Sequence, residues 1–364
     1  MKTTMQLAAL VFFAVAVLPV RADELSPEHR KAVDKGLAWV AKHQNPDGHW
    51  DANGGNYPVS MTALGGMALL MEGSTIRDGK YADNIRKATT WLMDRAQRSG
   101  MIGNPNNPIE AGRYMYGHGF SVLFLSQVYG EEEDADRREK LEKILTRAVE
   151  FIGKAQTARG GWGYVSARDG NGFDEGSVTI TQVQALRAAR NAGIVVPKQI
   201  IDKAQDYLKK CTTSRGGVIY SLANGGGARV GGERAPLTAA AVACMFSAGE
   251  YDSPLAKKWL EYCRGNIPLN LGGGARFGHQ EYTHYYYAQA LYILGDEGYA
   301  RLFPESKPGD RLTWSKYRKG VFDNLVRSQN ADGSWNGSIG TIYTTSLYLT
   351  ILQLDRSTLP IYQR

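Results

Sequence analysis

The stretch QNADGSW at residues 329–335 shows how the whole chain is built, because its pattern occurs twice more. QNPDGHW occupies residues 44–50 and QTARGGW occupies residues 156–162, so the pattern Q-x-x-x-G-x-W is present three times. Each copy follows a segment whose apolar residues recur at helical spacing. Self-similarity over such distances is the signature of a repeat architecture.

Degenerate copies of the same unit fill the gaps between these three. Residues 147–164 (RAVEFIGKAQTARGGWGY) align without a gap with residues 203–220 (KAQDYLKKCTTSRGGVIY), at an offset of 56. Two weaker copies lie around Ala96 and Arg264. The chain therefore contains six units, with equivalent points at Gln44, Ala96, Gln156, Thr212, Arg264 and Gln329.

Each unit also has a second apolar segment after its glycine loop. Helical spacing favours helices over strands for these segments, and five of them end with glycine, a common helix stop. They run over 58–73, 113–130, 175–193, 235–249, 282–295 and 342–354. The sequence therefore predicts six helix–loop–helix hairpins and twelve helices.

The two helices of a hairpin differ in composition. First helices carry many charges, as in residues 138–147 (REKLEKILTR), whereas second helices are rich in small apolar residues, as in residues 237–245 (LTAAAVACM). An open array would need terminal repeats with a polar outer face, and none stands out. We therefore predict an all-α closed double ring, with charged helices outside, as a single domain over residues 23–364.

The first 22 residues have the pattern of a secretory signal peptide. Lys2 precedes an apolar stretch over residues 7–20, and Val20-Arg21-Ala22 places small residues where a signal peptidase cleaves. An uncleaved N-terminal anchor is the alternative, but the apolar stretch is short for a membrane span. We expect cleavage near Ala22 and export to the periplasm or the extracellular space, with no transmembrane segment elsewhere.

Composition and charge exclude several classes of protein. A chain with 43% hydrophobic and 22% charged residues is not disordered. Without Lys2 and Arg21 the net charge falls from +7 to +5, and no Lys/Arg run indicates nucleic-acid binding. Three cysteines without a C-x-x-C, and six scattered histidines without an H-E-x-x-H, predict neither a metal site nor a cofactor. The sequence carries no signal for an oligomeric state.

The element Q-x-x-x-G-x-W is the QW motif, so the chain resembles the terpenoid-cyclase and protein-prenyltransferase superfamily, to which the squalene cyclases belong. The resemblance covers residues 26–354 and implies an (α/α)6 toroid with a functional central cavity, lined by the N-terminal ends of the inner helices. It also implies that the Gln and Trp of each motif knit neighbouring hairpins together. These structural residues are Gln44, Trp50, Gln156, Trp162, Gln329 and Trp335.

The chain departs from the chemistry of that superfamily. Squalene-type cyclases carry D-x-D-D before a Thr-Ala pair, but here residues 60–63 read SMTA and residues 236–239 read PLTA. Prenyltransferases bind zinc through Asp, Cys and His, but no D-x-C precedes His284. Aligning five inner helices on their final glycine makes Thr62, Gly119, Gln182, Thr238 and His284 equivalent, and Thr344 is aligned with them by eye because the sixth helix has no such glycine.

The candidate functional residues are polar side chains near the starts of the inner helices. Four of them fall on one face of the fifth inner helix: Tyr282, Tyr285, Tyr286 and Gln289. Others open the second and third inner helices: Tyr114, Tyr116, His118, Asp174 and Glu175. The structural alternatives are core packing for the tyrosines, helix capping for the two acids, and a buried structural role for the histidines. His118 and His284 lie one alignment position apart, so a shared cavity is a further prediction.

Two glycine-rich loops precede inner helices and carry arginine. Arg229 and Arg234 lie in residues 225–234 (GGGARVGGER), and Arg276 lies in residues 272–279 (GGGARFGH). Arginine suits a carboxylate or a phosphate, and glycine allows close approach of the backbone to a ligand. An anion site is one interpretation, and flexible turns with solvated arginines are the other.

Two classes of function follow from the sequence. One is a binding protein whose Tyr-lined central cavity holds an apolar, isoprenoid-like ligand. The other is an enzyme or binding protein for an exported substrate: a divergent terpene cyclase, or a polysaccharide lyase, hydrolase or binder acting on an acidic glycan. The expected partner is therefore a small molecule or an oligosaccharide.

Overall fold

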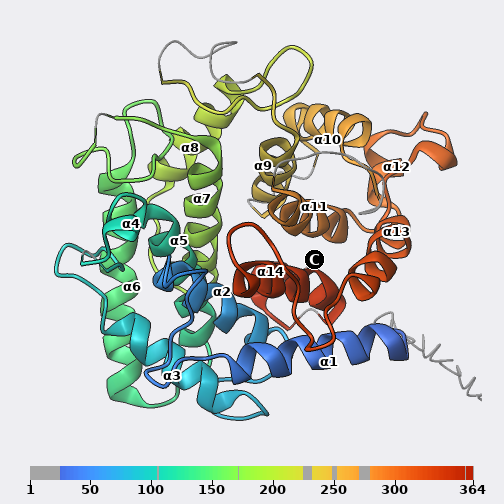
Figure 1. Cartoon of the computed structure of the whole chain (residues 1–364). Coiled ribbons are helices and arrows are strands. Elements are labelled where there is room, and N and C mark those ends of the chain that lie inside the picture. The colour runs from blue at the N-terminus through green and yellow to red at the C-terminus, as the bar shows by residue number, and fades with distance from the viewer. Residues whose placement is uncertain are drawn as a thin grey trace, which may run out of the picture.

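The computed structural model describes residues 25–104, 106–170, 172–223, 232–247, 252–269, 279–356 and 358–363 (Figure 1). This part of the chain contains fourteen α-helices, a few 3-10 turns and isolated bridges, but no strand. Within it, no helix is long and apolar enough to cross a membrane. The predicted signal peptide, Arg229 and Arg276 lie outside the described residues.

Six helices form a closed inner ring. Each contacts the next around the ring, and the last contacts the first. These helices are apolar on most sides, because they are covered both by the outer layer and by the ring interior. They are α2 (Pro58–Leu70), α5 (Tyr114–Tyr129), α7 (Gly176–Asn191), α9 (Ala235–Ser247), α11 (Gln280–Leu294) and α14 (Thr341–Gln353). The predicted all-α toroid is confirmed.

Six amphipathic helices cover this ring from outside. In α8, for example, Ala204, Tyr207 and Leu208 are buried against the inner layer. The outer helices are α1 (Pro27–Lys42), α3 (Ala82–Met93), α6 (Ala135–Ala155), α8 (Lys198–Lys210), α10 (Pro254–Asn266) and α13 (Trp314–Arg327). Two short helices that the sequence did not predict lie in connections: α4 (Pro108–Ala111) and α12 (Gly298–Leu302).

Local sequence sets the helix ends largely as expected. Ser26 caps α1 by accepting a hydrogen bond from the His29 N–H (3.2 Å), with Pro27 in the first turn. Gly193 and Gly295, after α7 and α11, have φ of +89° and +66°, which only glycine adopts easily. Gly130, at the end of α5, instead has a φ of −62°, so the end of this helix does not require a residue in the left-handed conformation.

The three Q-x-x-x-G-x-W stretches have the same geometry. The indole Nε1–H of each Trp donates a 2.8 Å hydrogen bond to a carbonyl of the outer helix before it: Val40, Ile152 or Leu325. The Gln side chain donates to a carbonyl of the next outer helix: Asn84 (2.9 Å), Ile200 (3.0 Å) or Ala32 (2.8 Å). Each stretch therefore joins two successive hairpins.

The backbone N–H of each Trp marks a second repeated contact, with an inner helix. It donates to Thr62 (3.1 Å), Thr179 (3.0 Å) or Thr345 (3.0 Å). In the degenerate units the acceptors are Thr238, for the Val218 N–H, and His118, for the Ile102 N–H.

These contacts define the equivalent positions of the inner helices. The predicted equivalence of Gly119 and Gln182 was wrong, because the inner helices differ in length between this position and their final glycine. The equivalence of Thr344 was also wrong, because the corresponding contact in α14 is made by Thr345. In α11 the matching residue is Thr283 rather than His284, since Thr283 bonds the His279 carbonyl four residues earlier, as Thr238 bonds Arg234.

The C-terminal segment returns to the ring after α14. Figure 1 shows the C-terminus beside α14 and α11. Thr358 donates to the Met71 carbonyl (3.1 Å), just after α2. The hydroxyl of buried Tyr362 lies 2.9 Å from that of buried Tyr285 on α11. The segment therefore packs against the ring at the end where α2 finishes.

Candidate functional site

A cluster of aromatic and charged side chains lies where α5, α7 and α9 begin. The Met115 N–H donates to the Tyr164 carbonyl (3.1 Å), and the Gly176 N–H donates to the Tyr220 carbonyl (2.9 Å). These bonds hold the loops before α7 and α9 against the starts of α5 and α7. We call the following residues the mouth cluster: Arg113, Tyr116, Tyr164, Phe173, Glu175, Ser177, Tyr220 and Arg234.

Three half-buried rings of the mouth cluster form an aromatic strip. The ring centroid of Phe173 lies 5.9 Å from that of Tyr164 and 6.3 Å from that of Tyr220. The hydroxyls of Tyr164 and Tyr220 are hydrogen bonded to each other. Two of the three rings border a depression of about 310 Å³, lined by Gly112, Tyr164, Val165, Ser166, Ala167, Gly170, Gly172 and Phe173.

A guanidinium group lies over the tyrosine at each end of this strip. The guanidinium carbon of Arg113 is 4.9 Å from the ring centre of Tyr164, and that of Arg234 is 4.8 Å from the ring centre of Tyr220. Both arginines are exposed. Such cation–π contacts hold a guanidinium in place without neutralising its charge.

Glu175 lies beneath the strip and is fully buried. It caps α7, because its carboxylate accepts hydrogen bonds from the backbone N–H groups of Ser177 (2.9 Å) and Val178 (2.8 Å). It also accepts from the Ser177 hydroxyl (2.6 Å) and the Tyr116 hydroxyl (2.9 Å). Burial raises the pKa of Glu175 above its ordinary value.

Asp174 is equally buried but faces the outer layer. Its carboxylate accepts from the Tyr207 hydroxyl (2.9 Å), the Ser221 hydroxyl (3.2 Å) and the Leu222 N–H (3.0 Å), and it forms an ion pair with Arg159. Hydrolysis of a glycosidic bond commonly uses two carboxyl groups. Both Asp174 and Glu175 accept hydrogen bonds from protein donors.

Tyr114 fastens one wall of the depression. Its hydroxyl donates to Asp169 (2.5 Å) and accepts from the Ser166 N–H (2.6 Å). Burial raises the pKa of Tyr114 above its ordinary value, so the hydroxyl keeps its proton. Tyr114 thus holds the loop before α7 in place.

The two candidate histidines are buried and face different outer helices. Nδ1 of His118 accepts from the Ile102 N–H (3.0 Å), and its Nε2 lies 3.3 Å from the Ala148 carbonyl in α6. Nδ1 of His284 lies 3.1 Å from the Tyr317 hydroxyl in α13. Burial lowers the pKa of each to about 4. The prediction of a shared cavity for His118 and His284 was wrong.

Three tyrosines of α11, Tyr282, Tyr285 and Tyr286, point into the ring interior. The ring centroid of Tyr286 lies 4.9 Å from that of Tyr282 and 4.8 Å from that of Tyr285. One turn further along, the Gln289 side chain accepts a 2.6 Å hydrogen bond from Gln184 of α7. Because α9 separates α7 from α11 in the ring, this bond crosses the interior. The predicted common face of α11 is confirmed.

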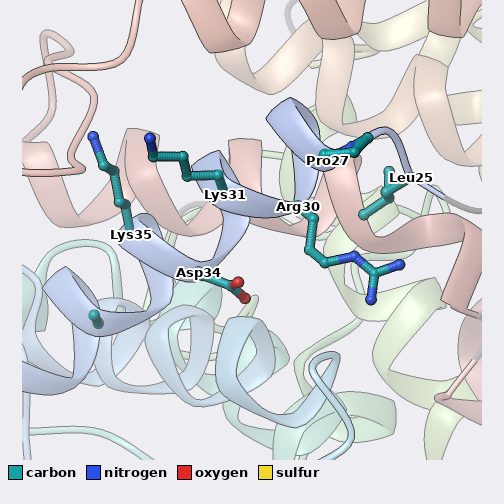
Figure 2. A pocket seen from close by; sticks show the side chains of 7 residues that line it. Leu25, Pro27, Arg30, Lys31, Asp34 and Lys35 are labelled. Carbon is teal, nitrogen blue, oxygen red and sulfur yellow. The ribbon is translucent and has the colours of Figure 1, made fainter.

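A second surface depression lies on outer helix α1 (Figure 2). Its volume is about 650 Å³, and its walls are Leu25, Pro27, Arg30, Lys31, Asp34, Lys35 and Ala38. All of these except Leu25 are exposed. It is therefore part of the solvated face of an amphipathic helix. Among the described residues, no group of three His, Cys, Asp or Glu side chains could hold a metal ion.

The sequence analysis did not single out five residues of the mouth cluster: Arg113, Tyr164, Phe173, Ser177 and Tyr220. A signal existed for two of them, because Tyr164 and Tyr220 are the last residues of the two segments that align at an offset of 56. Arg113, Phe173 and Ser177 have no comparable signal. Of the predicted residues, Tyr116, Glu175 and Arg234 belong to the cluster, while Arg276 lies outside the described residues.

No protein-family model and no curated protein matches the sequence. Among solved structures, the chain is similar to the type II terpene cyclase MstE from Scytonema, with 13% identity and a TM-score of 0.57 over 91% of this chain and 99% of that one. It is also similar to the GH76A α-1,6-mannanase of Salegentibacter sp., seen with α-1,6-mannotriose, with 10% identity and a TM-score of 0.63 over 91% and 99%.

A protein from Actinoplanes is a third neighbour, with 15% identity and a TM-score of 0.58 over 91% of this chain and 99% of that one. At these identities the likeness concerns the fold. The chain has an α/α-toroid fold. The same architecture holds geranylgeranyl dihydroxybenzoate in the terpene cyclase and an oligosaccharide in the mannanase.

Proposed function

We propose that the chain is an exported α/α-toroid protein that binds an oligosaccharide at the mouth cluster. The observation that carries this proposal is the half-buried strip of Tyr164, Phe173 and Tyr220 beside a depression of about 310 Å³. Aromatic walls with a few polar groups at the rim are typical of ligand sites. Export rests on the signal-peptide pattern of residues 1–22.

The surroundings of the strip support a site formed in advance of binding. Tyr116, Ser177 and Glu175 form a closed hydrogen-bond network beneath it, and Tyr114 fixes the loop at its side. A rigid site loses less conformational entropy when it binds. The mannanase with α-1,6-mannotriose supports the glycan class, because an oligosaccharide is bound there on the same fold.

Calorimetric titration of the chain from Asp23 with α-1,6-mannotriose and with trigalacturonate tests the proposal. We expect one of the two to bind, and Phe173→Ala to weaken that binding about tenfold, because a central aromatic contact is lost. Phe303→Ala is the matched control. Phe303 is also half-buried, but it directly follows α12 and its ring packs against that of Tyr299. Equal affinities of the two variants would place the ligand elsewhere.

A second candidate is an apolar isoprenoid in the ring interior. Tyr282, Tyr285 and Tyr286 supply an aromatic lining there, and the terpene cyclase binds a geranylgeranyl compound on this fold. Because these side chains already pack together and Tyr362 covers Tyr285, such a ligand has to displace them. A rise in the melting temperature with geranylgeraniol, with no response to either oligosaccharide, would favour this candidate.

A further inference from the structure

We propose that the starts of α11 and α14 form a subsite of the oligosaccharide site, where the carboxylate of Glu281 and the hydroxyl of Tyr282 bind the hydroxyl groups of a neutral sugar unit. This inference rests on the oligosaccharide site proposed above. It adds the chemical class of the ligand, a neutral rather than an acidic glycan. It also gives a role to Glu281, which the sequence alone did not single out.

The first step is a buried carboxylate that the protein leaves without a partner. Glu281 lies in the first turn of α11 and is only 8% exposed, yet its Oε1 has no hydrogen-bond partner. Glu175, at the start of α7, is also buried, but it accepts hydrogen bonds from four groups. Burying an acceptor without a donor is costly, and a ligand that supplies the donor removes this cost. Glu281 therefore has the property of a ligand-binding group.

The second step is that unpartnered hydroxyl groups lie beside Glu281. Its carboxylate faces the start of α14, because burial and then the charge of Glu281 raise the pKa of Tyr343 above its ordinary value. Thr344 follows in the first turn of the same helix, and its buried hydroxyl has no hydrogen-bond partner. The hydroxyl of Tyr282, the next residue of α11, is also buried without one. Three such polar atoms thus gather where α11 and α14 begin.

The third step connects this group of atoms to the mouth cluster. The pKa of Tyr282 is raised well above its ordinary value, first by burial and then by its neighbours. These neighbours include Tyr116 and Glu175, which belong to the mouth cluster. The ring of Tyr282 is half-buried, so part of it faces outward. Tyr282 is therefore close enough to the mouth cluster for one oligosaccharide to contact both.

The fourth step concerns the kind of group that fits these atoms. A carboxylate accepts hydrogen bonds, and neighbouring hydroxyls of a sugar can donate to it. The hydroxyls of Tyr282 and Thr344 can both donate and accept, as sugar hydroxyls can. An ammonium group only donates, so it would leave the protons of these two hydroxyls without an acceptor. An acidic sugar would place its carboxylate beside that of Glu281, and like charges oppose binding.

Calorimetry on the chain from Asp23 tests the subsite with α-1,6-mannotriose and trigalacturonate. We expect the neutral mannotriose to bind at least about tenfold more tightly. Glu281→Gln is expected to weaken mannotriose binding about tenfold, because hydrogen bonds to a charged acceptor are replaced by weaker ones, and Tyr282→Phe about fivefold. Glu297→Gln is the matched control, since Glu297 is exposed beyond the other end of α11.

Thermal unfolding of the same variants separates a ligand-binding role from a structural one. Because Oε1 of Glu281 and the hydroxyl of Tyr282 have no partner within the protein, neither substitution is expected to lower the melting temperature. Weaker binding at an unchanged melting temperature supports the subsite. Weaker binding together with a lower melting temperature would assign these groups to the fold and overturn it.

Further outcomes separate the subsite from the glycan site itself. Mannotriose binding that Phe173→Ala weakens, but Glu281→Gln and Tyr282→Phe do not, would overturn the subsite and keep the glycan site. Tighter binding of trigalacturonate than of mannotriose would overturn the neutral class. Tighter binding of triglucosamine, lost in Glu281→Gln, would replace the sugar hydroxyls by an ammonium group and also overturn it. Binding of none of these oligosaccharides by the folded protein would overturn both proposals.

Discussion

The side-chain amide of Gln329 donates a 2.8 Å hydrogen bond to the backbone carbonyl of Ala32, 297 residues earlier in the chain. The same amide also bonds the Gly333 carbonyl (2.9 Å) and so holds its own loop. Gln44 and Gln156 make the corresponding contacts between neighbouring hairpins. The contact that joins two successive units in the middle of the chain thus also joins its last unit to its first.

We expect Gln329→Ala to lower the free energy of unfolding by about 1–3 kcal/mol, because two partly buried carbonyls lose their donor. Urea denaturation followed by circular dichroism measures this. Gln199→Ala is the control, since Gln199 is exposed on α8. Equal stability of the two variants would show that this contact does not contribute to ring closure.

The threonine whose hydroxyl accepts a hydrogen bond from the Trp backbone N–H gives a second prediction. Thr179→Val keeps the shape of the side chain but leaves the buried Trp162 N–H without an acceptor. We expect a loss of about 1–3 kcal/mol in the free energy of unfolding. Thr90→Val, at an exposed position of α3, is expected to change it by less than about 0.5 kcal/mol. A Thr179→Val variant as stable as the control would contradict the role of this hydroxyl.

The buried histidines predict a loss of stability in acid. Burial lowers the pKa of His118 and His284 to about 4, whereas an unfolded histidine titrates near 6.5. Between these values the unfolded chain binds more protons, so stability falls as the pH drops from about 6.5 to 4, by up to about 3 kcal/mol for each histidine. His284→Gln should flatten this dependence in urea titrations between pH 4 and 7. An unchanged slope would contradict the neutral state assigned to His284.

Glu110 predicts the opposite dependence on pH. It is 2% exposed and accepts a hydrogen bond from the Val59 N–H (2.9 Å) at the start of α2. Burial raises its pKa to about 7, while an unfolded glutamate titrates near 4.5. The folded state therefore holds the proton more tightly, and the stability that this proton confers is lost as the pH rises from about 4.5 to 7.

Glu110→Gln keeps an acceptor for the Val59 N–H without the charge. We expect it to raise the free energy of unfolding at pH 8 by up to about 3 kcal/mol, and to have little effect at pH 4. Glu305→Gln is the control, because Glu305 is exposed. A gain in the free energy of unfolding at pH 8 no larger than that of the control would show that the ionised carboxylate of Glu110 does not destabilise the folded protein.

The particular residues that were predicted well share one property: their signal is local. Ser26 and Pro27 mark the start of α1, and Gly193 and Gly295 mark the ends of α7 and α11, because a cap or a left-handed glycine depends on a few neighbouring residues. The common face of Tyr282, Tyr285 and Tyr286 follows from helical spacing in the same way.

The predictions that failed depended on how one helix lies against another. His118 and His284 were assigned to one cavity, but each turns to its own outer helix. The register built on terminal glycines failed because helix length beyond the shared threonine position varies from unit to unit. Neither property is encoded within a short window of sequence.

The amino-acid sequence alone determined that this protein consists of six hairpins with charged first helices and apolar second helices, because periodicity and helix caps act over a few residues. Closure of the ring through Gln329 and Ala32, and the assembly of the mouth cluster, were determined by tertiary packing. Tyr164, Phe173 and Tyr220 form one strip with Arg113 and Arg234 because stacking of successive hairpins brings separate loops together. The relative position of those hairpins depends on contacts that no single repeat contains.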